Sequence, residues 1–218
     1  MSNKMRTQII IWLIAIGILA LLFGMWSSHN LSKANKQNTI TLSVGTILPM
    51  PRPVQAFQLT GLDNNAFTND NFKNHWTMIF FGFTHCPMLC PTTLSTLNQV
   101  YQKLQHDQVQ ALPQVLFISV DPERDSIQGI KEYLTSFNPA FIGARGDKDK
   151  IDAITKQFNV AYAKVMQNPT DQNYSVDHSG TILLVDPQGQ LYAIFSTPHN
   201  ANNIAGDYEK IIANAAKS

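Results

Sequence analysis

Long apolar runs and helical apolar repeats alternate along most of the chain. Nearly continuous apolar runs at 76–83 and 115–120 predict strands that are buried on both faces. Apolar residues that recur every three or four positions predict amphipathic helices, and these repeats cover residues 94–104, 127–137, 151–158 and 204–216. The two periodicities follow one another in turn, which is typical of an α/β domain.

Shorter apolar segments complete this pattern. We expect further strands at 55–60, 141–143, 160–165 and 181–185. Asp186-Pro-Gln-Gly189 predicts a hairpin turn into a last strand at 191–195. Strands that alternate with helices and end in a hairpin predict a mixed α/β sheet with helices on both faces.

The chain begins with a different pattern. Residues 9–26 run for 18 positions without a charge, about the minimum for a transmembrane helix. We interpret them as an uncleaved anchor between a cytoplasmic segment, 1–8, and a polar linker, 27–46, with the folded domain at 47–218. A cleaved signal peptide, with Ser27 and Ser28 as its small residues, is the alternative.

The charges beside the apolar run suggest its orientation. Lys4 and Arg6 lie close in front of it, whereas the first cations behind it are the more distant Lys33 and Lys36. Because cytoplasmic flanks carry the nearer positive charge, we expect the domain on the far side of the membrane. So few residues precede the run that an organellar transit peptide is disfavoured, and we expect a single-pass protein of a bacterial inner membrane with its domain in the periplasm.

Composition narrows the classes of function. The 16 basic and 15 acidic residues give a net charge of +1, and no basic stripe indicates a nucleic-acid partner. Apolar residues make up 44% of the chain, as in proteins with a globular core.

Cys86 and Cys90 are the two cysteines of the chain, and both follow the apolar run at 76–83. A thiol pair in a strand-to-helix turn binds a soft metal, exchanges electrons as a disulfide, or fastens the loop. A disulfide is chemically allowed outside the cytoplasm. As a mere fastener it would contribute roughly 2 kcal/mol for so short a loop, and a domain of this size does not need it.

The spacing separates the other two roles. Thioredoxin-like enzymes use Cys-x-x-Cys, and this chain has one more residue between its cysteines. On a helical first turn, residues four apart bring their Cβ atoms within about 6 Å. Two thiolates can then converge on one ion without bonding to each other.

A metal centre needs a further ligand. His178 precedes the predicted strand 181–185, and it can reach the cysteine turn if that strand neighbours 76–83. A hydrogen-bonded loop histidine is an equally good interpretation. Two thiolates and one imidazole suit Cu(I), whereas structural zinc wants a fourth protein ligand. Met88 adds a thioether between the cysteines, which we interpret as a flexible exposed side chain.

Three blocks of sequence resemble the Sco/SenC family and occur in its order. They are Gly82-Phe-Thr-His-Cys-Pro-x-x-Cys-Pro91, Ile118-Ser-Val-Asp-Pro-Glu-Arg-Asp125 and Tyr174-Ser-Val-Asp-His-Ser179. The resemblance spans roughly residues 47–215 and implies a thioredoxin-like fold. It also implies a copper chaperone for the binuclear copper site of cytochrome c oxidase subunit II, with Cys86, Cys90 and His178 as the copper ligands.

One departure and one rival function remain. The family usually has an aspartate and a small aliphatic residue where this chain has Met88 and Leu89. The acidic loop 121–125 falls on a family signature, and we prefer a structural role for Asp121, Arg124 and Asp125. The rival is a thiol-disulfide oxidoreductase that reduces the cysteines of the acceptor, so enzyme activity is left open.

Overall fold

The computed structural model describes residues 12–13, 15–27, 40–166 and 174–216. The chain divides into two compact units, one up to Thr41 and the other from Leu42 onward.

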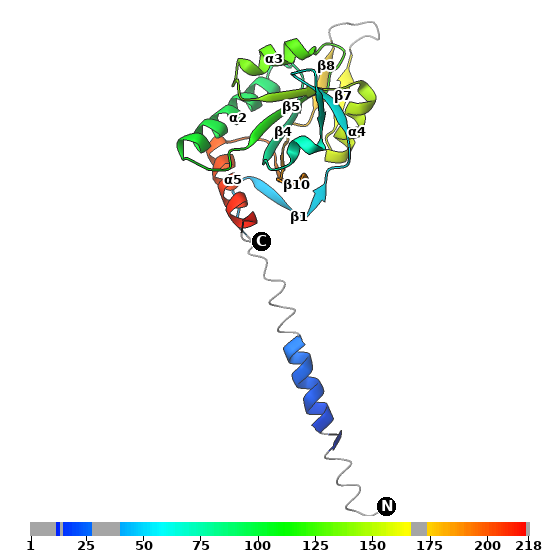
Figure 1. The fold of residues 1–218 in the computed structure, drawn as a ribbon, viewed down its shortest axis with the longest axis vertical. Helices are drawn as coiled ribbons and strands as arrows, with labels where there is room; N and C mark the ends of the chain where they lie inside the picture. Colours follow the sequence, from blue (N-terminus) through cyan, green and yellow to red (C-terminus); the bar gives the residue numbers. More distant parts are fainter. Residues whose placement is uncertain (1–11, 14, 28–39, 167–173, 217–218) are drawn as a thin grey trace, which may run out of the picture. The chain divides into compact units, whose positions relative to one another are not determined.

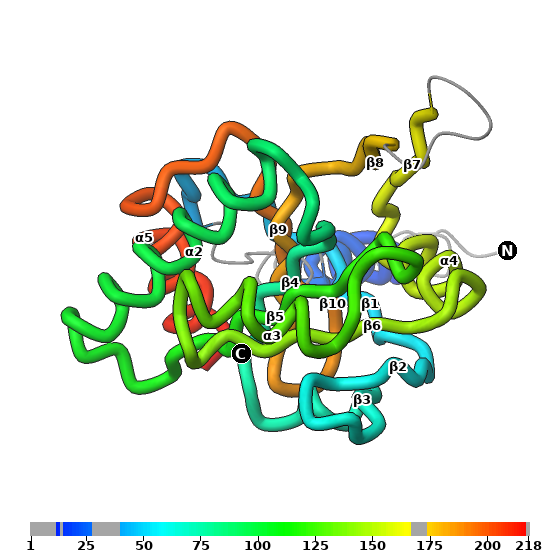
Figure 2. The backbone as a smooth tube through the Cα atoms, turned by 90° about the horizontal axis from the view of Figure 1, so that it is seen from above, coloured from blue at the N-terminus to red at the C-terminus, as the bar shows by residue number. Residues whose placement is uncertain are grey.

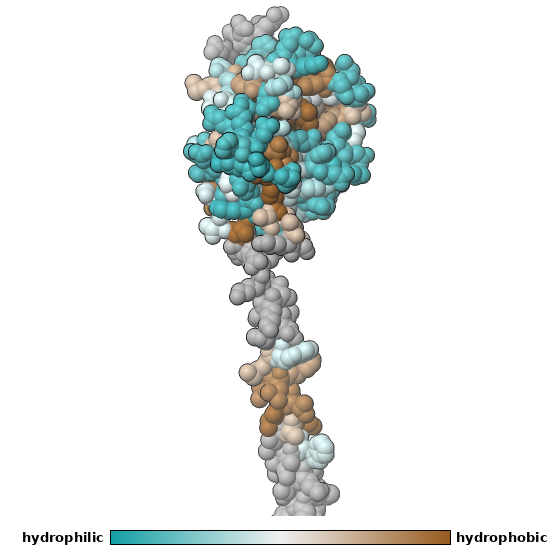
Figure 3. Space-filling view, turned by 60° about the vertical axis from the view of Figure 1, so that its left-hand side comes forward, coloured by the Kyte–Doolittle hydropathy of each residue, from teal (hydrophilic) through white to brown (hydrophobic). Residues whose placement is uncertain are grey.

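The first unit contains a helix that includes residues 15–27, and most of its large apolar side chains are exposed (Figure 3). Among the described residues we find no helix with the length and apolar character that crossing a membrane requires. The predicted anchor 9–26 includes residues 9–11 and 14, and the predicted segment 1–8 precedes it; these positions lie outside the described residues. The anchor therefore stays a prediction.

The second unit is built on a mixed sheet (Figure 1). Within the described residues its strands, in order across the sheet, are β1 (Gly45–Pro53), β10 (Gln190–Phe195), β9 (Ile182–Val185), β4 (Thr77–Gly82), β5 (Gln114–Ser119), β6 (Ile142–Arg145), β2 (Gln58–Gly61) and β3 (Ala66–Thr68). Strands β4, β5 and β6 are parallel, and β9 runs antiparallel to β4. The predicted mixed α/β sheet is confirmed.

Helices lie on both sides of this sheet (Figures 1 and 2). The helices of the domain are α2 (Leu89–His106), α3 (Ile127–Thr135), α4 (Lys148–Phe158), α5 (Ala201–Ala215) and the short 3-10 helix η1 (Asn69–Phe72). The Phe80 and Phe117 rings contact each other on one face, and the Phe117 ring also contacts Tyr133 of α3. On the opposite face Phe81 packs on Phe158 of α4.

Strand β4 is buried at every residue, because it lies in the middle of the sheet and is covered on both faces. Removing an aromatic side chain such as Phe80 from water contributes about 1.5–3 kcal/mol. This core fixes the carboxyl end of β4, and the cysteine turn starts there.

Three strands, β1, β3 and β8 (Ser175–His178), lie where the sequence predicted none. The edge strand β1 begins at Gly45, within the range interpreted as linker, and it contains three prolines that an edge position tolerates. Strand β8 pairs with β7 (Tyr162–Val165) in a small separate sheet. Only Val176 of β8 is buried, so its sequence lacks the apolar alternation that predicts a strand.

A buried carboxylate fastens the start of the domain. Asp207 of α5 accepts hydrogen bonds from the backbone amides of Ser43, Val44 and Gly45 at 2.8–2.9 Å. Lys210 lies 3.6 Å from the same carboxylate. The segment that leads into β1 is thus tied to the last helix.

Candidate metal centre

The two cysteines lie in the turn between β4 and α2, as predicted. Cys86 is partly exposed and Cys90 is fully buried in the first turn of α2. The backbone N–H of Cys90 points at the Cys86 sulfur, with 3.3 Å between the two atoms. Both cysteines are free thiols.

His178 reaches the same turn from the end of β8. We predicted this contact on the condition that the strand after His178 lies beside β4. Strand β9 does pair with β4, in antiparallel register. The His178 ring packs against Phe80 and Phe83, each with 5.8 Å between ring centroids. Its Nε2 lies 3.2 Å from the Cys90 sulfur.

The hydrogen bonds of His178 fix which nitrogen faces the sulfur. Nδ1 lies 3.1 Å from the Ser179 carbonyl oxygen, which can only accept, so Nδ1 carries the proton. Nε2 is then an acceptor, and the Cys90 thiol donates to it. Burial lowers the pKa of His178 below its ordinary value of 6.5, which keeps the ring neutral at pH 7.

The ligand atoms of these three residues all lie within 4.8 Å of one another. Burial raises the pKa of the Cys90 thiol well above its ordinary value, so this sulfur keeps its proton unless a cation replaces it. One ion between the three atoms would meet two sulfurs and one neutral imidazole nitrogen. Their assignment as ligands stays a prediction, and the geometry suits it.

The other histidines do not join this group. The His85 ring is exposed, and its Nδ1 lies 3.0 Å from the Thr84 hydroxyl. His75 and His106 are exposed as well, and His29 lies outside the described residues. His199 is partly buried, with its Nε2 2.6 Å from the Gly180 carbonyl oxygen.

Asp125 stabilises the start of the cysteine turn. Its buried carboxylate accepts hydrogen bonds from the Thr84 hydroxyl and the Ser119 hydroxyl, each at 2.6 Å, and from the Thr84 amide. The bonds connect the ends of β4 and β5. They fit the structural role that we expected for Asp125.

Asp121 and Arg124 hold the hairpin that carries His178. The Tyr174 hydroxyl donates to Asp121 at 2.7 Å, and Arg124 Nη1 donates to the Tyr174 carbonyl at 2.9 Å. The Arg124 guanidinium also lies 3.7 Å from the centre of the Tyr174 ring. Tyr174 belongs to the third sequence block that carries the resemblance. No role was predicted for it, because only the folded chain brings it to the acidic loop.

Gly82 gives the Cys90 sulfur its space. A Cβ atom at Gly82 would lie 2.7 Å from the Cys90 sulfur and 2.9 Å from Cε2 of Phe117. Both neighbours are fully buried, so neither can move away cheaply.

We therefore expect Gly82→Ala to displace Cys90. Overpacking should lower the folding stability by about 1–3 kcal/mol. The metal affinity should fall about tenfold or more, as is typical when a residue that supports a metal ligand is changed. Urea unfolding and a metal titration measure the two effects. Gly206→Ala is the matched control, because a Cβ there meets nothing within 4 Å and alanine favours the helix. Unchanged metal affinity in Gly82→Ala would contradict the packing argument.

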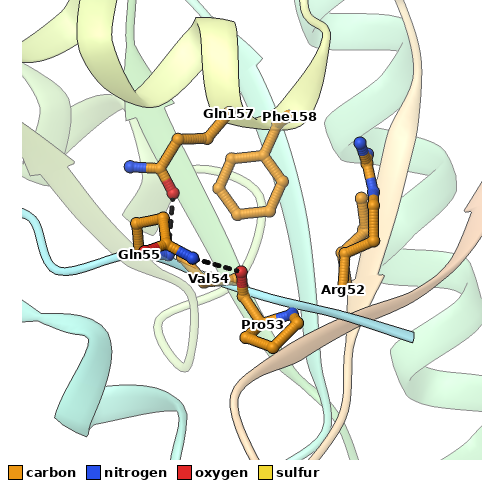
Figure 4. Close-up of a pocket in the computed structure, with 7 residues that line it drawn as sticks. Arg52, Pro53, Val54, Gln55, Gln157 and Phe158 are labelled. Atoms are coloured by element: carbon orange, nitrogen blue, oxygen red, sulfur yellow. Dashed lines mark hydrogen bonds between the residues drawn. The ribbon is translucent and has the colours of Figure 1, made fainter. Parts of the chain in front are cut away.

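A cavity of about 280 Å³ lies elsewhere, beside the end of β1 (Figure 4). Gln157 and Phe158 of α4 line it, and Gln157 accepts a hydrogen bond from the Gln55 amide at 3.0 Å. Arg52 borders the opposite side. The cavity contains none of the three clustered residues.

Comparison with known proteins gives a consistent result. The family model described as SCO1/SenC matches residues 48–213. An SCO2-like protein of Rickettsia typhi is 32% identical over 206 residues, which is 93% of this chain and 96% of the relative.

Solved structures are similar as well. Apo Sco1 of Thermus thermophilus has a TM-score of 0.70 and 34% identity, over 79% of this chain and 98% of that one. Yeast Sco1 with copper bound has a TM-score of 0.69 and 30% identity, over 75% and 90%. The thioredoxin-like fold that the resemblance implied is confirmed.

Proposed function

Because this chain belongs to the SCO1/SenC family, we propose that it is a membrane-anchored copper chaperone. It holds one copper ion through Cys86, Cys90 and His178 and delivers the ion to the binuclear copper site of cytochrome c oxidase subunit II. The observation that carries the proposal is the convergence of two sulfurs and one imidazole nitrogen within 4.8 Å.

The donor set favours copper over other cargo. Thiolates are soft ligands that select Cu(I), and Cu(I) accepts three ligands. A structural zinc site would need a fourth protein ligand, and no fourth His, Cys, Asp or Glu joins the cluster among the described residues. Yeast Sco1, a similar protein, has been crystallised with copper.

Loading exchanges protons for the ion. The Cys90 thiol donates to His178 Nε2 in the metal-free site, and Cu(I) takes the place of that proton between the two atoms. The His178 tautomer already presents the Nε2 lone pair, so the ring needs no rearrangement. The Cys90 amide, which points at the Cys86 sulfur, holds that sulfur toward the site.

The exposure of the ligands suggests the order of transfer. Cys86 is partly exposed whereas Cys90 is buried, so an incoming ligand reaches the ion from the Cys86 side. Stepwise exchange then replaces Cys86 first and releases Cys90 last. A cysteine- and histidine-containing acceptor suits such an exchange, and the family resemblance supports oxidase subunit II in that role.

The location is proposed from the sequence. The uncharged run 9–26 serves as a single-pass anchor, and Lys4 and Arg6 keep the N-terminus in the cytoplasm. The copper-binding domain then lies in the periplasm of a bacterium, beside the inner membrane.

A second function has a specific observation in its favour. The free thiols of Cys86 and Cys90 lie at the N-terminus of α2, where thiol-disulfide oxidoreductases place their reactive pair. Reduction of an acceptor's cysteines before metallation would use the same reduced pair. The two functions differ in their need for His178.

His178→Ala tests the assignment. We expect Cu(I) affinity to fall tenfold or more, about 1.4 kcal/mol or more, because one of three ligands is lost. Dithiol-disulfide exchange by the cysteine pair should persist, because both sulfurs remain. Competition with a colorimetric Cu(I) chelator and equilibration with glutathione measure the two quantities on the reduced full chain in detergent.

His106→Ala is the control, because its side chain is 89% exposed on the far end of α2. It should leave both quantities unchanged. Equal Cu(I) affinity in His178→Ala and the unaltered chain would reject the ligand assignment and leave the oxidoreductase function as the better account.

A further inference from the structure

The loop between β8 and β9 follows His178, and its backbone accepts and donates hydrogen bonds on two sides. The Ser179 amide donates to the Ala161 carbonyl at 3.1 Å, just before β7. The Gly180 carbonyl accepts a hydrogen bond from Nε2 of His199 at 2.6 Å. The second bond comes from a side chain that the proposed copper chemistry does not use.

The same loop packs closely against the cysteine helix. A Cβ atom at Gly180 would lie 2.8 Å from Cγ2 of Thr197 and 3.1 Å from Cδ1 of Leu89. Leu89 precedes Cys90 in α2. The loop of His178, the helix of Cys90 and the segment before α5 therefore meet at Gly180.

The protonation of His199 follows from its partners. The Gly180 carbonyl can only accept, so Nε2 carries the proton. Nδ1 is buried and has no hydrogen-bond partner among the described residues. Burial lowers the pKa of this ring below its ordinary value of 6.5. His199 is therefore a neutral donor with one partner.

The backbone of His199 is itself fixed. The next residue, Asn200, caps α5, and its side chain accepts a hydrogen bond from the Asn203 amide at 3.0 Å. The ring thus projects from a rigid helix start onto the loop, which is what a side chain needs to hold a neighbouring group in place.

We propose that His199 is a positioning residue for His178. The Nε2–H of His199 fixes the Gly180 carbonyl, and the adjoining Ser179 carbonyl accepts from His178 Nδ1 and sets the angle of that ring. With the loop held so, Nε2 of His178 faces the Cys90 sulfur at 3.2 Å. The inference rests on the proposed function, since it concerns the orientation of a copper ligand.

Two variants separate positioning from packing. His199→Gln keeps an N–H donor near the place of Nε2, whereas His199→Asn can offer one only near the place of Nδ1. We expect His199→Asn to weaken Cu(I) binding about tenfold, as typical for residues that orient a metal ligand. His199→Gln should stay within about threefold of the unaltered chain. Chelator competition on the reduced full chain in detergent measures both.

A spectroscopic readout follows the ring directly. In the metal-free reduced chain, nitrogen NMR of His178 should report the Nδ1–H tautomer in the unaltered protein and in His199→Gln, and a mixture of tautomers in His199→Asn. A role in packing alone would lower stability without changing the tautomer of a ring in another loop.

A double-mutant cycle completes the test. If His199 acts through His178, then His199→Asn causes no further loss of Cu(I) affinity in the His178→Ala background. An equal loss in both backgrounds would overturn the proposal, as would full affinity in His199→Asn when His178→Ala is weakened. A different result would reject the proposed function, namely full Cu(I) affinity in the His178→Ala variant itself.

Discussion

Serine in place of Cys90 is expected to abolish tight Cu(I) binding. Its sulfur lies 3.2 Å from His178 Nε2, and the Cys90 amide contacts the Cys86 sulfur, so Cys90 touches both of the other ligands. A serine hydroxyl is a hard donor that does not ionise at neutral pH. We expect a loss of affinity on the order of 1,000-fold, about 4 kcal/mol.

Metal analysis measures this result. The reduced full chain, loaded anaerobically with Cu(I), should retain one equivalent, and Cys90→Ser and Cys86→Ser should retain almost none. Met88→Leu is the matched control because it removes a sulfur from the same turn; the Met88 side chain is 74% exposed. One full equivalent retained by Cys90→Ser would remove the basis of the proposed function.

Asparagine in place of Asp207 is expected to destabilise the domain by about 3 kcal/mol at neutral pH. The carboxylate is fully buried and accepts hydrogen bonds from three backbone amides, of Ser43, Val44 and Gly45. Asparagine has one acceptor oxygen, and its amide group brings donors toward N–H groups that also donate. Hydrogen bonds to a charged group are worth about 1.5–3 kcal/mol, and unpaired buried groups add to the cost.

The same residue predicts a pH dependence. Burial alone would raise the pKa of Asp207, but the hydrogen bonds from Val44, Ser43 and Gly45 outweigh it and lower the pKa below its ordinary value of 3.8. A carboxylate with a lowered pKa in the folded state stabilises fully above its ordinary pKa, and the contribution is lost as pH falls through the folded value. The cost of Asp207→Asn should therefore be largest near pH 7 and shrink below about pH 4.

Urea unfolding at pH 7 and pH 3 tests both statements. Asp70→Asn is the control, because the Asp70 side chain is 71% exposed and its ion pair with Lys73 is a surface pair of little worth. A stability difference between Asp207→Asn and the unaltered chain that is the same at both pH values would contradict the electrostatic account.

The central fold was predictable because its signals are strong and local. The apolar run at 76–83 has the length of a buried strand, and β4 is buried throughout. The apolar repeat at 94–104 likewise predicted the middle of α2. The apolar repeat at 151–158 lies within α4, which begins slightly earlier, at Lys148.

Other parts depended on contacts that sequence patterns do not carry. Strand β8 has a single buried residue, Val176, so its pairing with β7 had no periodic signal. Predicted as a helical position, Phe137 lies beyond the end of α3 at Thr135. Edge strand β1 was hidden by prolines, which usually indicate a loop.

The candidate site divides in the same way. Cys86 and Cys90 are close in sequence, so their meeting followed from local structure. His178 is distant, and its position depended on β9 lying beside β4, which the sequence allowed but did not require. The tautomer of His178 and the contact of His199 with Gly180 follow only from the folded backbone.

The separation of the two sheets has a thermodynamic consequence. His178 ends a strand of the small β7–β8 sheet, while both cysteines follow the large sheet. An ion bound to all three would cross-link the two sheets, and any ligand that prefers the native state raises the midpoint of thermal unfolding by an amount that grows with the logarithm of its concentration relative to Kd. Under the proposed function, handing over the ion removes that cross-link. The empty protein should therefore melt at a lower temperature than the loaded one, and a melting curve alone would distinguish the two.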